Sequence, residues 1–324
     1  MRIAWLILAL LPLAAMAQQY PTKLVRIVVG SPGGGGIDIT GRPIAQRMSD
    51  VLGQQVIIDN RPGAAGMLAN ELVAKSAPDG HTILLTPGSF ITVSTHLNVQ
   101  APFDPLDNFA PVIQISAYQF VLVVHPSVPA SNARELIVAA KARPGALTFV
   151  SSGVGSNFHL AGELFRLGAR IELWHVPYKG SPSAVVDLLA GRGDMMFTQL
   201  PPVMPYIKAG RLRAIGVTGA RRSALLPDVL TIAEAALPGY ELYGFEGVLV
   251  PLKTPREIVL KLNATIATIL NTPEMKELWI NKGLEFPPNT PEQFGAKIRQ
   301  EYENAGKLIK AAVQHARGRI PIVA

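Results

Sequence analysis

Residues 30–38 read Gly30-Ser31-Pro32-Gly33-Gly34-Gly35-Gly36-Ile37-Asp38, and the predicted fold follows from them. They come after the apolar run of residues 24–29, which predicts a buried strand, and before an apolar pattern at helical spacing. Glycines at a strand-to-helix junction let the backbone turn sharply. They also let several free N–H groups point at one spot near the start of the helix, where an anion is stabilised. We interpret the stretch as an anion cradle.

The position of Asp38 narrows the class of anion. A dinucleotide fingerprint requires a third glycine where Asp38 stands, and a P-loop requires Lys followed by Ser or Thr. Asp38 would also repel a phosphate. A carboxylate fits better, held by backbone N–H groups of the stretch while Asp38 caps the helix or accepts a hydrogen bond from the ligand. A flexible turn in which Asp38 is only an N-cap remains the alternative.

The first 17 residues have the features of a signal peptide. Arg2 precedes an apolar run over residues 3–15, and Ala15-Met16-Ala17 has the small residues that a signal peptidase requires. We predict cleavage after Ala17 and export to the periplasm. The apolar run is shorter than the roughly 20 residues that a membrane span needs.

Composition excludes several classes of protein. The chain of 324 residues has no cysteine, so disulfides, thiol nucleophiles and cysteine metal sites are excluded. Its formal net charge of +7 is spread along the sequence, and an exported chain without a recognised nucleic-acid module is not expected to bind nucleic acid. A mildly positive field could steer small acidic solutes, although a solvated surface explains the same charge. The length suggests two domains.

Strands and helices alternate along the chain, which predicts α/β lobes with doubly wound sheets and ligands at the carboxyl ends of the strands. The exit loop of the third predicted strand carries Ser89, a candidate ligand contact. We assign residues 18–124 and 245–324 to lobe 1 and residues 125–244 to lobe 2. Two chain crossings then join the lobes, and the ligand cleft lies between them.

A second glycine loop repeats the opening feature in lobe 2. The strand predicted at residues 147–151 is followed by Ser152-Gly153-Val154-Gly155-Ser156-Asn157-Phe158-His159, directly before a helix. Ser156 is the expected N-cap, and Gly155, Ser156 and His159 are candidate ligand contacts. Lys179, after the next strand, could pair with a second carboxylate of the ligand or simply be solvated. Two cradles on two lobes suggest one clamp.

The sequence contains few signs of a catalytic site or a metal site. No histidine pair has helical metal-site spacing, no H-E-x-x-H or G-x-S-x-G motif occurs, and no cofactor is expected. Ser156 and His159 stand three residues apart at a helix start, so a hydrolase using this pair remains open. Plain cap and core roles for both residues remain open as well.

Several motifs occur together in one order along the mature chain. They are Pro32-Gly33-Gly34 with Asp38 and Arg42, Asn60-Arg61-Pro62-Gly63-Ala64-Ala65-Gly66, Ala77-Pro78-Asp79-Gly80-His81-Thr82, Ser152-Gly153-Val154-Gly155-Ser156 with His159-Leu160-Ala161-Gly162-Glu163, and Val176-Pro177-Tyr178-Lys179-Gly180. Together they resemble the Bug-type receptors of tripartite tricarboxylate transporters.

This resemblance implies a periplasmic binding protein of the type II kind, with two lobes that close on a carboxylate-bearing solute. It implies delivery of the solute to a membrane permease with one large and one small subunit. It also implies that backbone N–H groups and waters hold the proximal carboxylate, at Gly33, Gly34, Gly35 and Asp38 in lobe 1 and at Gly155, Ser156 and His159 in lobe 2. We expect a monomer without catalytic activity.

The chain departs from the family pattern in two places. Ile37 stands where the pattern commonly has Thr, and Val29-Gly30 replace the usual Pro and aromatic residue. The loss of a hydroxyl beside the cradle predicts a less polar ligand contact. Two other functions remain as alternatives, an exported hydrolase using Ser156 and His159 and an extracytoplasmic ligand sensor for a signalling system.

Overall fold

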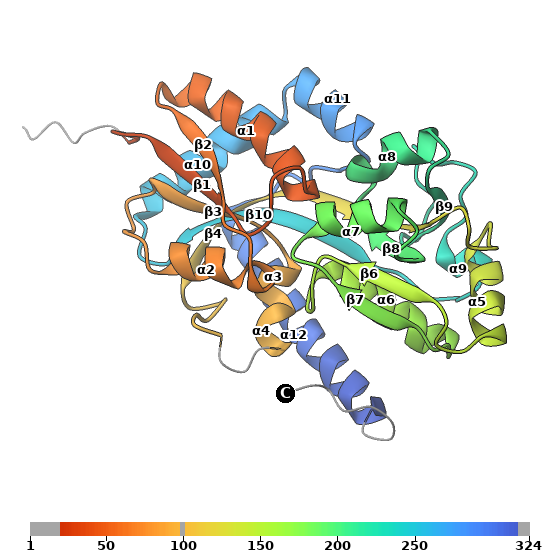
Figure 1. The fold of residues 1–324 in the computed structure, drawn as a ribbon. Coiled ribbons are helices and arrows are strands. Elements are labelled where there is room, and N and C mark those ends of the chain that lie inside the picture. The colour runs from red at the N-terminus through yellow and green to blue at the C-terminus, as the bar shows by residue number, and fades with distance from the viewer. Residues whose placement is uncertain (1–19, 98–100, 317–324) are drawn as a thin grey trace, which may run out of the picture.

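The computed structural model describes residues 20–97 and 101–316, so the predicted signal peptide lies outside the described residues. The described residues form two α/β lobes that lie side by side, each built on a five-stranded sheet (Figure 1). Helices cover both faces of the sheets, and hydrophobic clusters fill the space on either side of each sheet. The predicted pair of doubly wound lobes joined by two crossings is confirmed.

The glycine-rich stretch of residues 30–38 directly follows a strand of the first sheet. The strands of this sheet lie in the order β2 (Val56–Asn60), β1 (Val25–Val29), β3 (Thr82–Pro87), β10 (Tyr243–Pro251) and β4 (Phe109–Gln119). The pairs β1 with β2 and β1 with β3 are parallel, whereas β10 runs antiparallel to both of its neighbours. Parallel strands present their carboxyl ends at one edge of the sheet, where the loops of lobe 1 gather.

The second sheet has the same plan. Its strands lie in the order β7 (Trp174–Pro177), β6 (Thr148–Ser151), β8 (Met195–Thr198), β5 (Val121–Val124) and β9 (Arg213–Val217). Here β5 is the antiparallel strand in the fourth position. Each lobe is therefore completed by a strand that enters directly from the other lobe.

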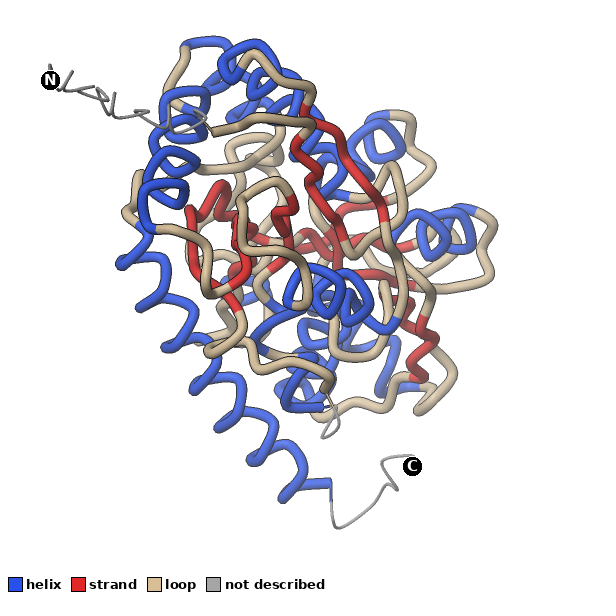
Figure 2. Tube along the Cα trace, turned by 90° about the vertical axis from the view of Figure 1, so that its left-hand side faces the viewer, coloured by secondary structure: helices blue, strands red, loops and turns tan. Residues whose placement is uncertain are grey.

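The helices fall into two sets. Lobe 1 contains η1 (Ala64–Gly66), α1 (Gly36–Leu52), α2 (Met67–Ala74), α3 (Ser89–Thr92), α4 (Ser94–Leu97), α10 (Arg256–Leu270), α11 (Pro273–Asn281) and α12 (Pro291–Ala316). Lobe 2 contains α5 (Ala133–Ala142), α6 (Asn157–Ala169), α7 (Ser181–Leu189), α8 (Leu200–Lys208) and α9 (Ile232–Ala235). The long helix α12 packs on β4 and continues past the body of lobe 1 (Figure 2).

One predicted strand belongs to the other lobe. Residues 120–124 were assigned to lobe 1, but β5 pairs with β8 and β9 of the second sheet. The outward crossing therefore lies at Phe120, between β4 and β5, and not after Val124. The run is apolar and buried in either sheet, so its sequence does not distinguish the two partners.

The two crossings meet at Thr218, a fully buried residue directly after β9. Its hydroxyl accepts a hydrogen bond from the Phe120 N–H (2.9 Å) and donates one to the Leu242 carbonyl (2.6 Å). Backbone bonds from Thr218 N–H to Phe120 O and from Leu242 N–H to Thr218 O complete the junction. Both connections between the lobes are thus tied together at one residue.

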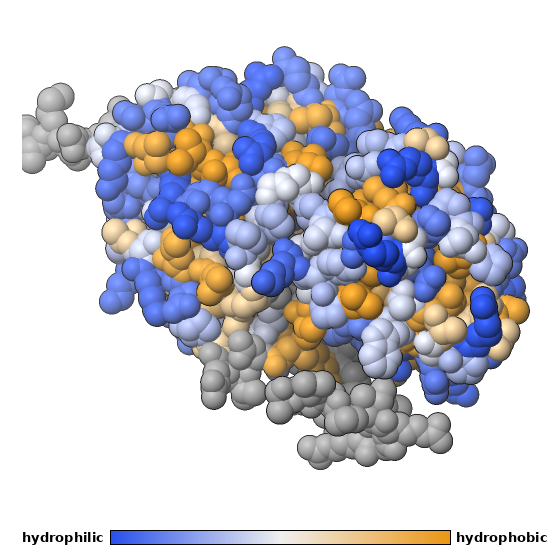
Figure 3. Space-filling model, in the orientation of Figure 1, coloured by the Kyte–Doolittle hydropathy of each residue, from blue (hydrophilic) through white to orange (hydrophobic). Residues whose placement is uncertain are grey.

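The surface mixes hydrophilic and hydrophobic residues on both lobes, with the hydrophobic ones in separate patches on the face shown in Figure 3. Among the described helices, none combines the length and the apolar character that a membrane crossing requires.

Candidate functional site

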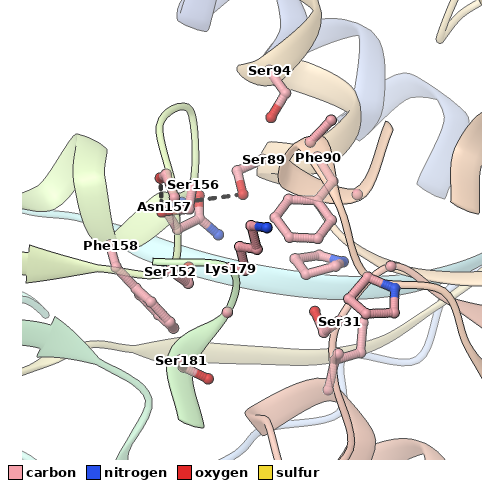
Figure 4. A pocket seen from close by; sticks show the side chains of 18 of the residues that line it. Ser31, Ser89, Phe90, Ser94, Ser152, Ser156, Asn157, Phe158, Lys179 and Ser181 are labelled. Atoms are coloured by element: carbon pink, nitrogen blue, oxygen red, sulfur yellow. Dashed lines mark hydrogen bonds between the residues drawn. The ribbon is translucent and has the colours of Figure 1, made fainter. Parts of the chain in front are cut away.

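A cavity of about 750 Å³ lies between the two lobes. Its walls come from the loops at the carboxyl ends of strands in both sheets, including residues 30–32 of lobe 1 and residues 152–154 of lobe 2. The close-up in Figure 4 shows side chains from both lobes directed toward this space. A ligand in the cavity would contact both lobes at once.

Helix N-termini converge on the cavity. The first residue or the N-cap of six helices lines it, namely α1 (Gly36), α2 (Met67), α3 (Ser89), α6 (Asn157), α7 (Ser181) and α8 (Gln199). Each helix N-terminus carries free N–H groups and a partial positive charge. The helix starts therefore favour an anion in the cavity, although few of its side chains are charged.

The side chains at the wall are mostly hydroxyl-bearing or apolar. Six serines line it: Ser31, Ser89 and Ser94 from lobe 1, and Ser152, Ser156 and Ser181 from lobe 2. Among the described residues, Lys179 and Glu246 are the only ones with a formal charge that line the cavity. Lys179 extends toward the centre of the view in Figure 4. Within the described parts of the chain, no carboxylate lies in ion-pair distance of its ammonium group.

Asp38 does not line the cavity, but its hydrogen bonds fix the shape of the first glycine loop. Its carboxylate accepts the Gly34 N–H (2.9 Å), two hydrogen bonds from Arg42 (2.8 Å each) and one from Asn60 (3.1 Å). Burial opposes ionisation, but the bonds from Arg42, Gly34 and Asn60 outweigh it and lower the pKa of Asp38. Asn60 also donates to the Ser31 carbonyl, so one cluster ties both ends of the loop. The N-cap of α1 is Gly35, so the expected capping role of Asp38 is wrong.

Ser156 and His159 shape the second glycine loop. Ser156 is the N-cap of α6, as predicted. Its hydroxyl accepts the His159 backbone N–H (3.2 Å) and donates to the Gly153 carbonyl (2.7 Å). The Nδ1 of His159 accepts the Gly155 N–H (3.2 Å), which requires a neutral ring. Burial lowers the pKa of His159, consistent with that assignment.

Three aromatic rings stack beneath this loop. The His159 and His175 ring centroids lie 4.3 Å apart, and the His175 and Phe149 centroids 4.5 Å apart. Nε2 of His175 is within hydrogen-bond distance of the Ser151 hydroxyl (2.7 Å). Burial, with a smaller effect from the neighbouring His159, lowers the pKa of His175 to about 3. The loop of residues 153–155 therefore rests on two neutral imidazoles.

The lobes touch each other around the cavity. The Asn157 N–H at the start of α6 donates to the Ser89 hydroxyl (3.2 Å), and the Ser94 hydroxyl donates to the Gly155 carbonyl (3.3 Å). Gly180 of lobe 2 approaches Pro32 of lobe 1 so closely that a Cβ atom would lie 2.5 Å from the proline Cγ. The arrangement is a closed cleft.

The predicted site residues lie together around the cavity, but only some of them line it. Ser89, Ser156 and Lys179 line the cavity. Behind the wall lie Gly33, Gly34, Gly35, Asp38, Gly155 and His159, which form or support the two glycine loops. Both carboxylate oxygens of Asp38 and the Nδ1 of His159 are hydrogen-bonded within the protein.

Residues absent from the sequence prediction complete the site. Tyr118 at the end of β4, Gln199 after β8 and Glu246 on β10 all border the cavity and are buried. Gln199 follows the carboxyl end of a strand, a position that the rule for doubly wound sheets could have singled out. Glu246 lies inside an apolar strand with no neighbouring motif, so its position offered no signal.

The geometry disfavours the hydrolase alternative. The Ser156 hydroxyl donates to a backbone carbonyl, and the His159 ring accepts from a different group, so the pair lacks the nucleophile–base bond. Residues 20–97 and 101–316 contain no cluster of metal-binding side chains.

Comparison with known proteins gives consistent similarities. Residues 40–313 match the profile of a family described as "Tripartite tricarboxylate transporter family receptor". The "UPF0065 protein in tcbD-tcbE intergenic region" of Pseudomonas sp. (strain P51) is 39% identical over 311 residues, which is 95% of this chain and 92% of that protein. BugT of Bordetella pertussis is 33% identical over 295 residues, 91% of this chain and 90% of BugT. The structure of R. palustris Rpa4515 with adipate has a TM-score of 0.88 at 35% identity, covering 90% of this chain and 98% of that one.

Proposed function

Because the chain belongs to the tripartite tricarboxylate transporter receptor family, a family of periplasmic solute-binding receptors, we propose that it captures a small carboxylate between its lobes. The convergence of six helix N-termini on one cavity carries this proposal. Each N-terminus stabilises a nearby anion by about 0.3–1 kcal/mol, and several act on the same ligand. The chain then delivers the solute to the permease subunits of a tripartite transporter.

The polar contacts of the proposed ligand come from groups that do not already donate within the protein. We propose that the Ser89 hydroxyl and the free N–H groups at the helix starts that line the cavity surround one carboxylate. The N–H groups of Gly34, Gly35 and Gly155 and the hydroxyl of Ser156 already donate within the protein, so these residues shape the two loops. Asp38 and His159 hold these loops in shape from behind. Ile37, Phe90 and Phe158 also line the cavity and give the ligand an apolar contact.

Lys179 provides the proposed site for a second carboxylate. Its side chain is the one cation at the wall of the cavity, and it extends toward the cavity centre (Figure 4). The related protein Rpa4515 was solved with adipate, a dicarboxylate. A dicarboxylate would place one end at the glycine loops and the other at Lys179.

Calorimetry with a panel of mono-, di- and tricarboxylates, adipate included, tests this function. Lys179→Met should weaken dicarboxylate binding about 10-fold, as expected for the loss of one charge-assisted hydrogen bond. It should change monocarboxylate binding less. Lys208→Met, at the end of α8 and outside the cavity lining, is the matched control and should bind normally. Absence of binding to every carboxylate in the panel, together with turnover of an ester, would refute the proposal.

Location and assembly follow from the same proposal. We propose a monomer in the periplasm whose signal peptide is cleaved after Ala17. N-terminal sequencing of the mature protein from a periplasmic fraction should begin at Gln18, and native mass spectrometry should give the mass of one chain. Deletion of the gene should abolish uptake of the bound carboxylate, whereas a signalling defect with normal uptake would indicate a sensor.

A further inference from the structure

A buried carboxylate lies at the junction between the lobes. Glu246 on β10 is fully buried, and its carboxylate accepts three hydrogen bonds. Thr40 of α1 and Ser116 of β4 donate to Oε2 at 2.8 and 3.0 Å, and both belong to lobe 1. The third donor is Nε2 of Gln199, at 2.8 Å from Oε1. Gln199 is the N-cap of α8 and belongs to lobe 2.

Gln199 reaches Glu246 through a gap at the start of α1. Gly36 is the first residue of α1, and a Cβ atom there would lie 1.2 Å from Gln199 Oε1 and 2.4 Å from its Cδ. The three atoms nearest to that Cβ position all belong to Gln199. Any side chain at position 36 would therefore displace Gln199 from its present place.

The surroundings favour a bond that exists only when the lobes are together. Gln199 is 4% exposed, and its one side-chain hydrogen bond among the described residues is the bond to Glu246. Of the three donors to Glu246, Gln199 alone comes from the opposite lobe, so separation of the lobes removes this bond and leaves the other two. The carboxylate would then face the water-filled cleft, which replaces the lost donor.

We propose that Gln199 is a closure latch, which holds the two lobes together through Glu246, and that Gly36 is the gap that admits it. Burial raises the pKa of Glu246, and a hydrogen bond to its carboxyl group corresponds to a change of about 10-fold in an equilibrium constant. The latch thus sets how often the ligand-free receptor closes. This inference rests on the two-lobe closing motion of the proposed function, but on no particular ligand.

Pulsed electron spin measurements between labels on the two lobes test the latch without any ligand. The chain has no cysteine, so spin labels attach only at cysteines introduced at Val51 on α1 and Val186 on α7. Both side chains are more than half exposed, at 60% and 58%. Gly36→Ala and Gln199→Ala should each raise the ratio of open to closed distances about 10-fold or more.

The double variant separates the latch from a general effect of mutation. Once Gln199 is Ala, the three atoms nearest to a methyl group at position 36 are gone, so Gly36→Ala should add little to Gln199→Ala. Gly168→Ala, inside α6 with its nearest contact at an ordinary 3.5 Å, is the control for glycine replacement in a helix and should match the parent protein. Thermal melting of each labelled variant confirms that it is folded.

Three results would overturn the inference. One is a Gly36→Ala distance distribution that matches Gly168→Ala. Another is a double variant more open than Gln199→Ala alone. The third is a parent protein that is already fully open without ligand. Because no carboxylate is added, failure here is distinct from failure of the binding panel.

Discussion

Asp38 illustrates how a single side chain can serve a binding site without facing it. The sequence placed it beside the glycines, where a cap or a ligand contact are the two obvious roles. In the structure its carboxylate faces away from the cavity and holds Gly34, Arg42 and Asn60 together. This cluster fixes the backbone of the loop, so Asp38 would affect a bound ligand through the shape of the loop.

Replacement of Asp38 tests this role. Asp38→Asn removes the charge that Arg42 pairs with and an acceptor of the Gly34 N–H, so it should destabilise the protein by about 1–3 kcal/mol. Carboxylate affinity should fall as well, because the loop loses its support. Denaturant unfolding and calorimetry measure the two effects. Glu71→Gln, which removes an exposed pair with Lys75, is the control and should cost less than about 1 kcal/mol without a change in affinity.

Ser156 is an N-cap that also lines the cavity, and a second N-cap away from the cavity tests whether Ser156 affects binding as well as stability. Ser156→Ala removes the cap of α6, and Thr272→Ala removes the equivalent cap of α11, away from the cavity. Each should lower the free energy of unfolding by about 1 kcal/mol. Only Ser156→Ala should also weaken carboxylate binding in calorimetry. Equal affinities in the two variants would limit Ser156 to helix capping.

The sequence was informative where a residue acts through its own backbone conformation and less so where it acts through a distant partner. The two glycine loops and the Ser156 cap could be predicted, because local spacing determines them. The contact between Gln199 and Glu246 could not, since it joins residues 47 positions apart in different lobes. Gly36 looked like one more glycine of the loop, and its close approach to Gln199 appears only in three dimensions.

Among the elements, strand β7 at the edge of the second sheet has a special relation to α6. It brings His175 under His159, so the two imidazoles stack on Phe149 and support the loop of residues 153–155. Both rings are neutral at neutral pH, because burial lowers the pKa of each. Protonation of His159 at Nδ1 would break its bond from Gly155.

The stability of the protein should therefore depend on pH in the acidic range. The pKa of His175 is about 3 in the folded protein, against about 6.5 for an unfolded chain. Between these values the unfolded state binds more protons, so stability falls as the pH falls, with a slope of up to about 1.4 kcal/mol per pH unit.

Urea unfolding between pH 7 and pH 4 measures this slope. His175→Phe should reduce it, and His159 should leave a residual slope, since its pKa is lowered too. His125→Phe, outside the stack, is the control and should keep the parent slope. A slope unchanged by His175→Phe would contradict the proposed source of the pH dependence.

The alternation of strands and helices predicted these elements, but not the partners of every strand. Residues 120–124 form a strand as expected, yet they pair in the other sheet. A short apolar strand fits any buried sheet, and only the arrangement of the whole chain selects one.

At the scale of the molecule, Thr218 joins the two crossings about which the lobes would move. Thr218→Val keeps the shape of the side chain but leaves the Phe120 N–H without its acceptor, which should cost about 1–3 kcal/mol. Small-angle scattering should show a decrease in the radius of gyration when the parent protein binds its carboxylate, and the size of this decrease should change in Thr218→Val.

A second threonine controls for the loss of stability. Thr254→Val removes another buried hydroxyl, which bonds the Pro251 carbonyl in lobe 1 far along the chain from the crossings. Thr254 follows the end of β10 opposite to the crossing at Leu242, so Thr254→Val should lower stability yet keep the parent change in radius. A radius that ligand leaves unchanged in the parent protein would place the binding site within one lobe.

The chain supplies all the strands of the second sheet before the last strand of the first sheet, and this has a consequence for the order in which the protein folds. All five strands of the second sheet come from one continuous segment, residues 121–217, whereas the first sheet needs β10 at residues 243–251 to join β3 to β4. A chain that emerges from its N-terminus can therefore complete the later lobe before the earlier one. Until β10 arrives, β3 and β4 expose open edges, and exposed edges are prone to aggregation. The lobe whose sequence comes first is thus the last to be finished, and it is the one that would most need protection after export.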